Sequence, residues 1–577
     1  MPAAETNATG TLQDIGQLDH SVTAEYRIFG PPGTGKTTNL TRQIRRAVER
    51  FGQDSVLVTS FSRTAAAELA GRDLPLSPDR IGTLHSHCFH ALGCPQIAEC
   101  NVEEWNKDNP HLQITPKKQQ GRLDGEESVG DDGAEREKAG DDCLEELNRW
   151  RGMMIPADGW PAVVREFAAK WQHYKDAHGL LDFCDLIDIA LHDVPAAPKN
   201  PSVIFADEAQ DLNRMQLRLI RKWGERAHYF IVAADDDQTI YSFTGATPDA
   251  VLDPDIPEDH KIILKQSFRV PRAIHARAVR WIEQVTRRQE KAYLPRAFEG
   301  ELIRLSSGTY KSPEYYILKT ALQHLEQGKS VMFLATCGYM LQPIVQVLRK
   351  NALPFHNPYR RSNGFWNPLR MGRGSSANRV LSLVVAHPQF GANSRPWTCG
   401  DVAIWAEWLH AEGIIKRGAK KRLSSLTPAE TATIETLDDT FEPGALEALL
   451  KTFEDDYRGL LDWWRRRLNA TFFQRAQFPA DIAAVRGPQA LLDVPRVVVG
   501  TIHSVKGGEA DVVYLFPDLS GEGDAAYQQS GAPRDSGDPA ILRRHDAGAG
   551  DPLHLPAGIG YGGADLMATG SKDCLER

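Results

Sequence analysis

The sequence predicts an α/β protein built on two doubly wound parallel sheets. Short apolar runs recur along the 577 residues, and they are apolar on both faces, which is typical of buried parallel strands. Helix-like patterns separate many of the runs, so helices should cover both faces of each sheet. A chain of this length should form about three or four domains rather than one core. The expected strands are residues 25–29, 56–58, 203–205, 230–233, 262–264, 331–334, 497–499 and 512–515.

The apolar runs fall into two groups, one before about Gly245 and one after about Lys261, and this predicts two lobes. Two helix-like stretches interrupt them. A charged, glycine-rich stretch within the first should be a disordered loop. The tryptophans of the second are expected in a core rather than on a nucleic-acid surface. The predicted parts are the first lobe (1–92 and 184–258), its insertion (93–183, with the loop at 121–142), the second lobe (259–371 and 489–520), its insertion (372–488) and an aberrant, disordered tail (521–577).

Composition is that of a cytoplasmic protein. No apolar run approaches the ~20 residues of a membrane span, and residues 1–20 lack the apolar block of a signal peptide. The eight cysteines form no C-x-x-C pair, which argues against a disulfide framework or a structural zinc site. The net charge of −9 neither supports nor excludes nucleic-acid binding, because a local basic groove decides phosphate contact.

Residues 30–37 (GPPGTGKT) fit G-x-x-x-x-G-K-S/T, the nucleotide phosphate loop. A short strand precedes the loop, and apolar residues recur every fourth position after it, as on a helix that ends near Gly52. Backbone N–H groups of such a loop surround phosphates, and the helix start adds a positive dipole end. Lys36 is expected to reach the terminal phosphates and Thr37 to ligate Mg²⁺. The candidate nucleotide-binding residues here are Gly30, Pro31, Pro32, Gly33, Thr34, Gly35, Lys36, Thr37 and Thr38.

Two acids follow the predicted strand at 203–205. The carboxyl ends of strands are where open α/β sheets place their sites. Asp207 is expected to hold Mg²⁺, and Glu208 to orient and deprotonate the attacking water. Together with an upstream phosphate loop, this pair predicts nucleoside triphosphate hydrolysis.

Seven blocks resemble, in order, the motifs of superfamily 1 helicases of the UvrD/Rep type. The family carries two RecA-like lobes, each with a mainly helical insertion, and uses ATP and Mg²⁺. The matching blocks are 61–68 (FSRTAAAE), 82–86 (GTLHS), 181–186 (LDFCDL), 207–211 (DEAQD), 234–246 (ADDDQTIYSFTGA), 266–269 (QSFR) and 501–509 (TIHSVKGGE).

The resemblance implies roles at the nucleotide. Gln238 would touch the γ-phosphate and the attacking water. Arg269 would come from the second lobe as an arginine finger across the cleft. Phe268 would face the adenine, and Glu509 would meet the ribose. With Lys36, Asp207 and Glu208, Gln238 and Arg269 complete the candidate catalytic set.

The resemblance also implies a motor on single-stranded DNA, moving 3′ to 5′ in repair, recombination or replication. Duplex junctions would be substrates, repair or replication proteins partners, and the chain a monomer or weak dimer. Base stacking and phosphate contacts tolerate any sequence, as a moving motor requires. The candidates for stacking are Phe61, Tyr241 and Phe243, and those for phosphate contact are Arg63, Thr83, His85, Thr501 and His503.

Some patterns have a second interpretation. The histidines of 85–90 could bind a metal, although no second ligand cluster lies nearby. The acids 235–237 could form a cation site, or be solvated or helix-capping. The basic runs at 416–422 and 465–467 could touch duplex DNA or form a solvated face. Lys506 could bind a phosphate or lie on the surface.

Two departures from the family stand out. The upstream segment 11–18 resembles only weakly the family's block whose glutamine recognises adenine. After Leu519 the family's last arginine-bearing motif is missing, but codons allowed for residues 541–552, read one nucleotide forward, can spell FYVAMTRARETL. We therefore expect a frameshift between about Leu519 and Ala540.

The alternatives to a helicase are a hexameric ATPase of the AAA kind and a helicase-derived DNA-binding ATPase that does not unwind. The blocks at 207–211, 234–246 and 501–509 argue against the first alternative. The lost motif favours the second alternative.

Overall fold

The chain divides into two compact units, Met1–Leu302 with part of the tail, and Ile303–Asp518 with another part. The computed structural model describes residues 24–61, 63–117, 138–239, 241, 244–283, 285, 287–305, 313–314, 317–360, 364–372, 374–454 and 456–516, and the backbone of 564–568. Each unit holds one six-stranded sheet. Within these residues, no helix combines the length and the apolar character that a membrane crossing requires.

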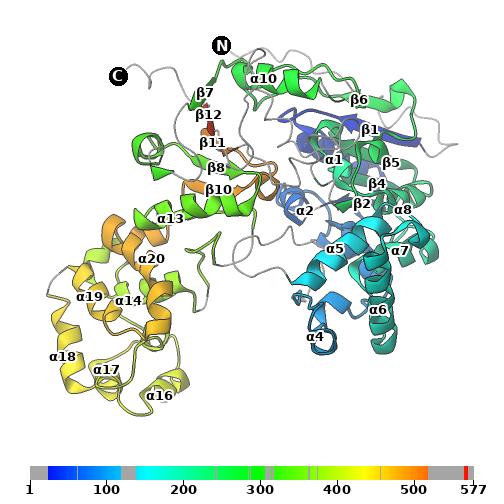
Figure 1. The fold of residues 1–577 in the computed structure, drawn as a ribbon. Helices are drawn as coiled ribbons and strands as arrows, with labels where there is room; N and C mark the ends of the chain where they lie inside the picture. The colour runs from blue at the N-terminus through cyan, green and yellow to red at the C-terminus, as the bar shows by residue number, and fades with distance from the viewer. Residues whose placement is uncertain are drawn as a thin grey trace. The chain divides into compact units, whose positions relative to one another are not determined.

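The sheet of the first unit is parallel throughout, with the order β3-β2-β4-β5-β1-β6. All of these strands except β3 are labelled in Figure 1. The carboxyl ends of the parallel strands therefore share one edge. Phe29, Ser60, Asp207 and Ala234 end their strands there, so the residues that follow them can meet. The strands are β1 (Ala24–Phe29), β2 (Val56–Ser60), β3 (Ile81–Thr83), β4 (Val203–Asp207), β5 (Tyr229–Ala234) and β6 (Lys261–Ile263).

Helices cover both faces of this sheet, as its strands require. Val56 and Val58 of β2 pack in one apolar cluster while Leu57 packs in another, because side chains alternate along a strand. Helix α1 buries Leu40 and Ile44 in the first of these clusters. The helices are α1 (Lys36–Phe51), α2 (Arg63–Ala70), α3 (Leu84–Ala91), α8 (Arg214–Gly224), α9 (Pro248–Leu252) and α10 (Arg272–Ile282).

A helical insertion separates β3 from β4. It has its own core, in which Trp105, Phe167 and Trp171 are almost fully buried. Its helices are α4 (Glu103–Asp108), α5 (Ala139–Gly152) and α6 (Ala162–His178), and α7 (Phe183–Asp193) returns the chain to the sheet. Residues 139–142, expected in a disordered loop, instead form the first turn of α5, where Asp141 accepts a hydrogen bond from the backbone of Lys138. The rest of that loop, 121–137, lies outside the described residues.

The sheet of the second unit has the order β7-β12-β11-β8-β10-β9. Its β8, β9, β10 and β11 are parallel, and β12 pairs antiparallel with β11. The strands are β7 (Glu301–Leu305), β8 (Val331–Ala335), β9 (Phe355–His356), β10 (Val497–Thr501), β11 (Val512–Phe516) and β12 (Ala564–Ala568), with helices α12 (Leu322–Glu326) and α13 (Gln342–Lys350).

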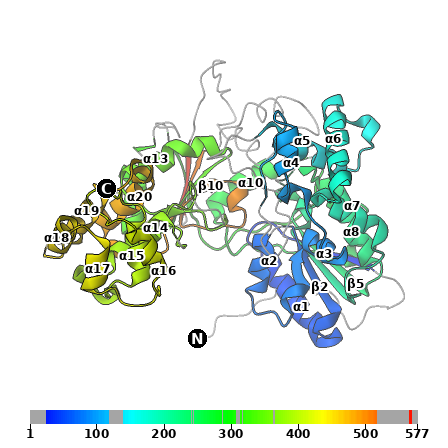
Figure 2. The same cartoon turned by 90° about the horizontal axis from the view of Figure 1, so that it is seen from below.

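The second unit also contains a bundle of short helices between β9 and β10, gathered together in Figure 2. Trp405 and Trp464 are fully buried in its core and Trp408 and Trp463 nearly so, which confirms their predicted core role. The helices are α14 (Ser376–Val384), α15 (Cys399–Ala406), α16 (Ala419–Ser425), α17 (Ile434–Thr440), α18 (Pro443–Lys451), α19 (Tyr457–Arg465) and α20 (Ala470–Arg486).

All eight strands expected from the sequence are present, but two expectations about their grouping are wrong. Residues 261–263 form β6 of the first sheet, because β1 has an open edge with which they pair. The first unit therefore runs on to Leu302 rather than ending at residue 258. The tail, expected to lack strands, contributes β12 to the edge of β11. Residues 517–563 and 569–577, which include the expected frameshift segment, lie outside the described residues.

Candidate functional site

The phosphate loop joins β1 to α1, and its glycines adopt backbone angles that other residues disfavour. Gly33 and Gly35 have φ angles of 74° and 81°. Gly35 precedes α1 without a side chain to cap it, and the first turn holds no acidic residue. The N–H groups of that turn are thus suited to an anion. Lys36 is buried, and its Nζ donates to the Gly30 carbonyl oxygen at 2.6 Å.

These residues fit a magnesium-bound nucleoside triphosphate. The loop supplies amide donors, and Lys36 supplies a cation beside them. Thr37 lies in the first turn of α1, and Asp207 ends β4, so each offers an oxygen of the kind Mg²⁺ prefers. Within the described residues, no cluster of three or more His, Cys, Asp or Glu side chains forms a protein-only metal site. That finding gives no support to a metal at the histidines of 85–90.

The two acids after β4 are held by their own backbone and by a glutamine. Asp207 is buried, and its Oδ1 accepts a hydrogen bond from the Glu208 N–H at 3.1 Å. Glu208 adopts the left-handed conformation, with φ 52° and ψ 39°, which costs a non-glycine residue about 1–3 kcal/mol. The Gln210 amide donates to Glu208 Oε2, and its Oε1 accepts from the Asp235 N–H at 3.0 Å. Gln210 therefore joins the ends of β4 and β5.

Asp235, directly after β5, interacts with several side chains. Its Oδ2 accepts a hydrogen bond from the Gln238 side chain and lies 3.9 Å from Lys36 Nζ. Lys36 and Gln238, far apart in the sequence, thus meet at one carboxylate. Asp235, Asp236 and Asp237 all form ion pairs with Lys291. The acidic run is therefore neither solvated nor open to a free cation. Burial raises the pKa of Asp236, although Lys291 opposes the effect.

The segment after β6 lies against the phosphate loop. The Phe268 N–H donates to the Gly33 carbonyl at 2.8 Å, and Ser267 Oγ donates to the Pro32 carbonyl at 2.9 Å. Phe268 is 70% exposed, so its ring is available to a ligand. The expectation that Arg269 reaches across from the second lobe is wrong, because these bonds hold it in the first unit with Lys36.

The first unit also carries six of the residues predicted to face DNA. Phe61 packs on Tyr241 with ring centroids 4.8 Å apart, and Tyr241 is buried. Thr83 is buried, and its hydroxyl accepts from the Ser86 N–H at 3.2 Å, so it caps α3. His85 is buried, and burial lowers its pKa to about 4, so it is neutral near pH 7. Arg63 begins α2.

Two of the first unit's predictions lie partly or wholly outside the described residues. These are the side chain of Arg63 and the whole of Phe243.

Three further candidates lie in the second unit. Thr501 ends β10, is buried, and accepts from the Ser504 N–H at 3.3 Å. His503 follows in a short 3₁₀ turn, and Glu509 is exposed before β11. Lys506 is half-buried and follows the same turn.

Two of the basic runs have structural partners in the second unit. Lys416 Nζ donates to the Asp438 carbonyl at 2.6 Å, and Lys420 Nζ donates to the Leu409 carbonyl at 2.7 Å. Arg465 pairs with Asp481 at 2.6 Å. These contacts favour a structural role over contact with duplex DNA.

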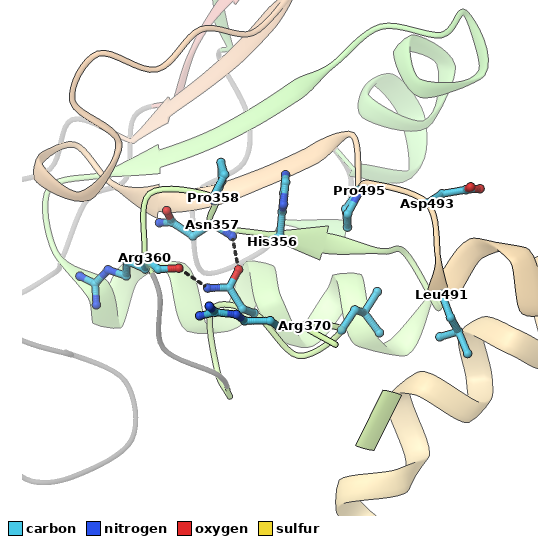
Figure 3. A pocket seen from close by; sticks show the side chains of 10 residues that line it. His356, Asn357, Pro358, Arg360, Arg370, Leu491, Asp493 and Pro495 are labelled. Atoms are coloured by element: carbon cyan, nitrogen blue, oxygen red, sulfur yellow. Dashed lines mark hydrogen bonds between the residues drawn. The ribbon is translucent and has the colours of Figure 1, made fainter. Parts of the chain in front are cut away.

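A cavity of about 290 Å³ lies beside β9 in the second unit (Figure 3). Its wall includes Arg360, Arg370 and two asparagines. The Asn357 N–H donates to Asn367 Oδ1 at 2.9 Å, and Asn367 Nδ2 donates to the Arg360 carbonyl at 2.9 Å. These hydrogen bonds therefore stabilise the turn that follows β9, and we assign no ligand to the cavity.

Sequence patterns missed Lys291, Arg288 and Tyr293, which contact the acidic run or the phosphate loop. More than fifty residues separate Lys291 from its carboxylates (|i−j| = 55 for Asp236), so no local spacing could reveal the pairing. A buried ion-pair network in the insertion was also missed, in which Lys175 and Arg151 bind Asp182 and Asp185. Asp182 and Asp185 belong to the 181–186 block, but no sequence pattern indicated Lys175 or Arg151 as their partners.

Comparison with known proteins agrees with this geometry. Residues 16–255 match the UvrD/REP helicase N-terminal domain. The chain is 25% identical over 262 residues to YjcD of Bacillus subtilis (strain 168), assigned as an ATP-dependent DNA helicase, covering 42% of this chain and 34% of YjcD.

It is also 23% identical over 363 residues to the ATP-dependent DNA helicase PcrA of Staphylococcus aureus (strain Mu50), covering 58% of this chain and 48% of PcrA. The chain thus spans about a third to a half of the length of the curated relatives it matches. Residues 16–255 therefore resemble the UvrD/REP helicase N-terminal domain, and the chain is similar over part of its length to ATP-dependent DNA helicases.

Proposed function

We propose that this chain hydrolyses ATP to move along single-stranded DNA, as a helicase or translocase of 3′-to-5′ polarity. The single observation that carries the proposal is the network around Asp235. The Asp235 carboxylate lies within 3.9 Å of Lys36 and accepts a hydrogen bond from Gln238, and the backbone N–H of Asp235 is joined through Gln210 to Glu208. A phosphate-binding lysine, a sensor amide and a base are thereby coupled in one unit.

The chemistry follows from where these groups lie. Lys36 and the N–H groups at the start of α1 would bind the phosphates. Glu208 would take the proton of the attacking water, which Gln238 would help to orient. Arg269, held beside the loop, would stabilise charge at the leaving phosphates. Mg²⁺, bound by Thr37 and Asp207, supplies charge neutralisation at the phosphate oxygens. Phe268 would face the adenine, and Glu509 of the second unit the ribose.

DNA would contact residues of both units. Phe61 and Tyr241 already pack as a pair, and the part-exposed Phe61 ring offers a stacking face worth about 1–3 kcal/mol per base. Arg63, Phe243, His503 and the hydroxyls of Thr83 and Thr501 complete the proposed set. A buried, neutral His85 would act as a hydrogen-bonding group rather than as a cation. The proposed setting is the cytoplasm, with DNA junctions as substrates and repair or replication proteins as partners.

The experiment is ATP hydrolysis by the full chain with and without single-stranded DNA, together with strand displacement on a duplex with a 3′ tail. DNA should stimulate hydrolysis, and Lys36→Ala should abolish it while leaving thermal unfolding unchanged. Hydrolysis that ignores both DNA and the Lys36 substitution would overturn the proposal. Hydrolysis with stimulation but no displacement would establish the alternative of a DNA-binding ATPase without unwinding.

We also propose that the reading frame changes between about Leu519 and Ala540. The support is the motif spelled by the forward frame at 541–552. Sequencing the gene tests this directly, since a forward frame that does not spell the motif excludes it. A chain with the frame restored should hydrolyse ATP faster with DNA present than the chain as written. Equal rates would contradict a functional effect of the altered tail.

A further inference from the structure

Lys291 is a fully buried lysine held by three consecutive carboxylates. Its Nζ lies 2.9 Å from Asp237 Oδ2 and 3.3 Å from Asp235 Oδ1, and it also pairs with Asp236. Burial alone would lower the pKa of Lys291, but the three carboxylates outweigh it and raise that pKa. A buried cation of this kind persists only when it is paired and hydrogen-bonded. The lysine and the acidic run therefore depend on each other.

One of these carboxylates is the group that also faces the nucleotide residues. Asp235 Oδ2 accepts from Gln238 and lies 3.9 Å from Lys36 Nζ, while its other oxygen faces Lys291. Asp235 and the phosphates of a bound nucleotide would compete for Lys36, because the same ammonium must reach those phosphates. The charge that Asp235 presents to Lys36 is set in part by how completely Lys291 neutralises the acidic run.

The chain around Lys291 is also bonded to the segment that carries Arg269. Tyr293 donates its hydroxyl to the Pro32 carbonyl at 3.0 Å, within the phosphate loop. The Leu294 N–H donates to the Lys265 carbonyl at 2.8 Å, and the Ser267 N–H donates to the Leu294 carbonyl at 2.8 Å. Lys291 thus anchors the acidic run from a segment that also supports the phosphate loop.

We propose that Lys291 is a positioning residue for nucleotide binding: it neutralises the acidic run 235–237 and so allows Lys36 and Gln238 to engage the phosphates. This inference rests on the proposed function for the identity of the ligand. Without Lys291, uncompensated carboxylates would draw Lys36 toward Asp235 and weaken the hold of the loop on phosphate. Asp236 contributes charge to this balance and accepts a hydrogen bond from Lys291.

The test is the affinity of the full chain for a fluorescent ATP analogue, measured by fluorescence anisotropy at pH 8. Lys291→Met should weaken binding by about tenfold or more, since a charge is removed close to the ligand in a protein interior. The double variant Lys291→Met/Asp236→Asn restores the charge balance and should recover most of the affinity. Lys261→Met is the matched control, because Lys261 also pairs with two carboxylates, at 2.8 and 2.7 Å, but away from the loop.

A second readout separates charge balance from simple structural support. The charged groups that face Asp236 are Lys291, Asp235 and Asp237, with Arg288 on Asp237 and Lys36 on Asp235. In Lys291→Met, lowering the pH from 8 to 6 should favour the protonated form of Asp236, whose pKa is already raised by burial, and tighten binding relative to wild type.

Unchanged affinity in Lys291→Met would overturn the proposal, as would a loss that neither Asp236→Asn nor low pH relieves. If Lys291→Met does not fold, the single variant Asp236→Asn tests the proposal. It should bind the analogue as tightly as wild type or more tightly. Binding that is tenfold weaker than wild type would contradict the proposal. Hydrolysis by the wild-type chain tests the proposed function separately, so the two failures are distinguishable.

Discussion

Gly33 and Arg269 approach each other so closely that a β-carbon on Gly33 would lie 2.4 Å from the β-carbon of Arg269. The same β-carbon would lie 2.8 Å from Ser267 Oγ. Only glycine therefore allows the segment 267–269 to lie on the phosphate loop. This contact places the arginine predicted to act as a finger beside the lysine predicted to bind phosphate, within one unit.

Gly33→Ala should weaken nucleotide binding and destabilise the first unit by about 1–3 kcal/mol, because it adds both a clash and an unfavourable positive φ. Gly179→Ala is the matched control, since Gly179 also has a positive φ, of 63°, in the left-handed helical region, but a β-carbon added there would meet no atom within 4 Å. The control should show only the smaller backbone cost, with normal binding. Chemical denaturation and nucleotide titration measure the two effects. Equal behaviour of the two variants would show that the close contact is unimportant.

Arg269→Ala should lower the rate of ATP hydrolysis by about 10³–10⁵-fold while changing nucleotide affinity much less, as expected for a group that stabilises developing charge. Arg272→Ala, on the exposed side of the same segment at the start of α10, should hydrolyse ATP normally. Single-turnover kinetics with saturating ATP measure the difference. A loss confined to affinity would assign Arg269 to ground-state binding instead.

Glu208→Gln should lower the hydrolysis rate by about 10²–10⁴-fold and leave nucleotide binding intact, because an amide cannot accept the proton of the attacking water. The exposed Glu283, just after α10, provides the control substitution Glu283→Gln. Steady-state rates and analogue binding are the measurements. Full activity in Glu208→Gln would exclude this carboxylate as the base.

Glu99→Gln should change stability in a pH-dependent way. Glu99 is fully buried, and burial, reinforced by Asp182, raises its pKa to about 7. The pKa of Glu99 is higher in the folded state than its unfolded value of about 4.3, so the protonated carboxyl favours the folded state. This contribution to the free energy of unfolding is fully present below the unfolded pKa and is lost as the pH rises through about 7. The neutral glutamine avoids this loss and can still accept the Phe183 N–H, which Glu99 Oε1 accepts at 3.1 Å.

The variant should therefore be more stable than wild type by about 1–3 kcal/mol at pH 8 and nearly equal to it at pH 5. Urea unfolding at both pH values is the measurement. Glu103→Gln, exposed on α4 in the same insertion, should show no such difference. A variant that is less stable than wild type at both pH values would contradict the raised pKa.

Local sequence was sufficient for the strands and for the phosphate loop. Continuous apolar runs identify strands buried on both faces, and the spacing of glycines, lysine and threonine at 30–37 depends only on how a short loop surrounds phosphate. The acids after β4 and the tryptophans of the second insertion followed from the same kind of local pattern. These features depend on neighbours a few residues away, and the sequence contains that information directly.

Tertiary structure decided which sheet received β6, where Arg269 lies, and what the acids 235–237 bind. Lys261–Ile263 pair with the edge of β1, a strand more than two hundred residues earlier in the chain (Lys261 lies opposite Arg27). No local sequence pattern indicates this pairing. The ion pairs of Lys291 likewise join residues that are distant in sequence but share one buried site. Burial makes such partners mutually dependent, and burial is a property of the folded chain rather than of any segment.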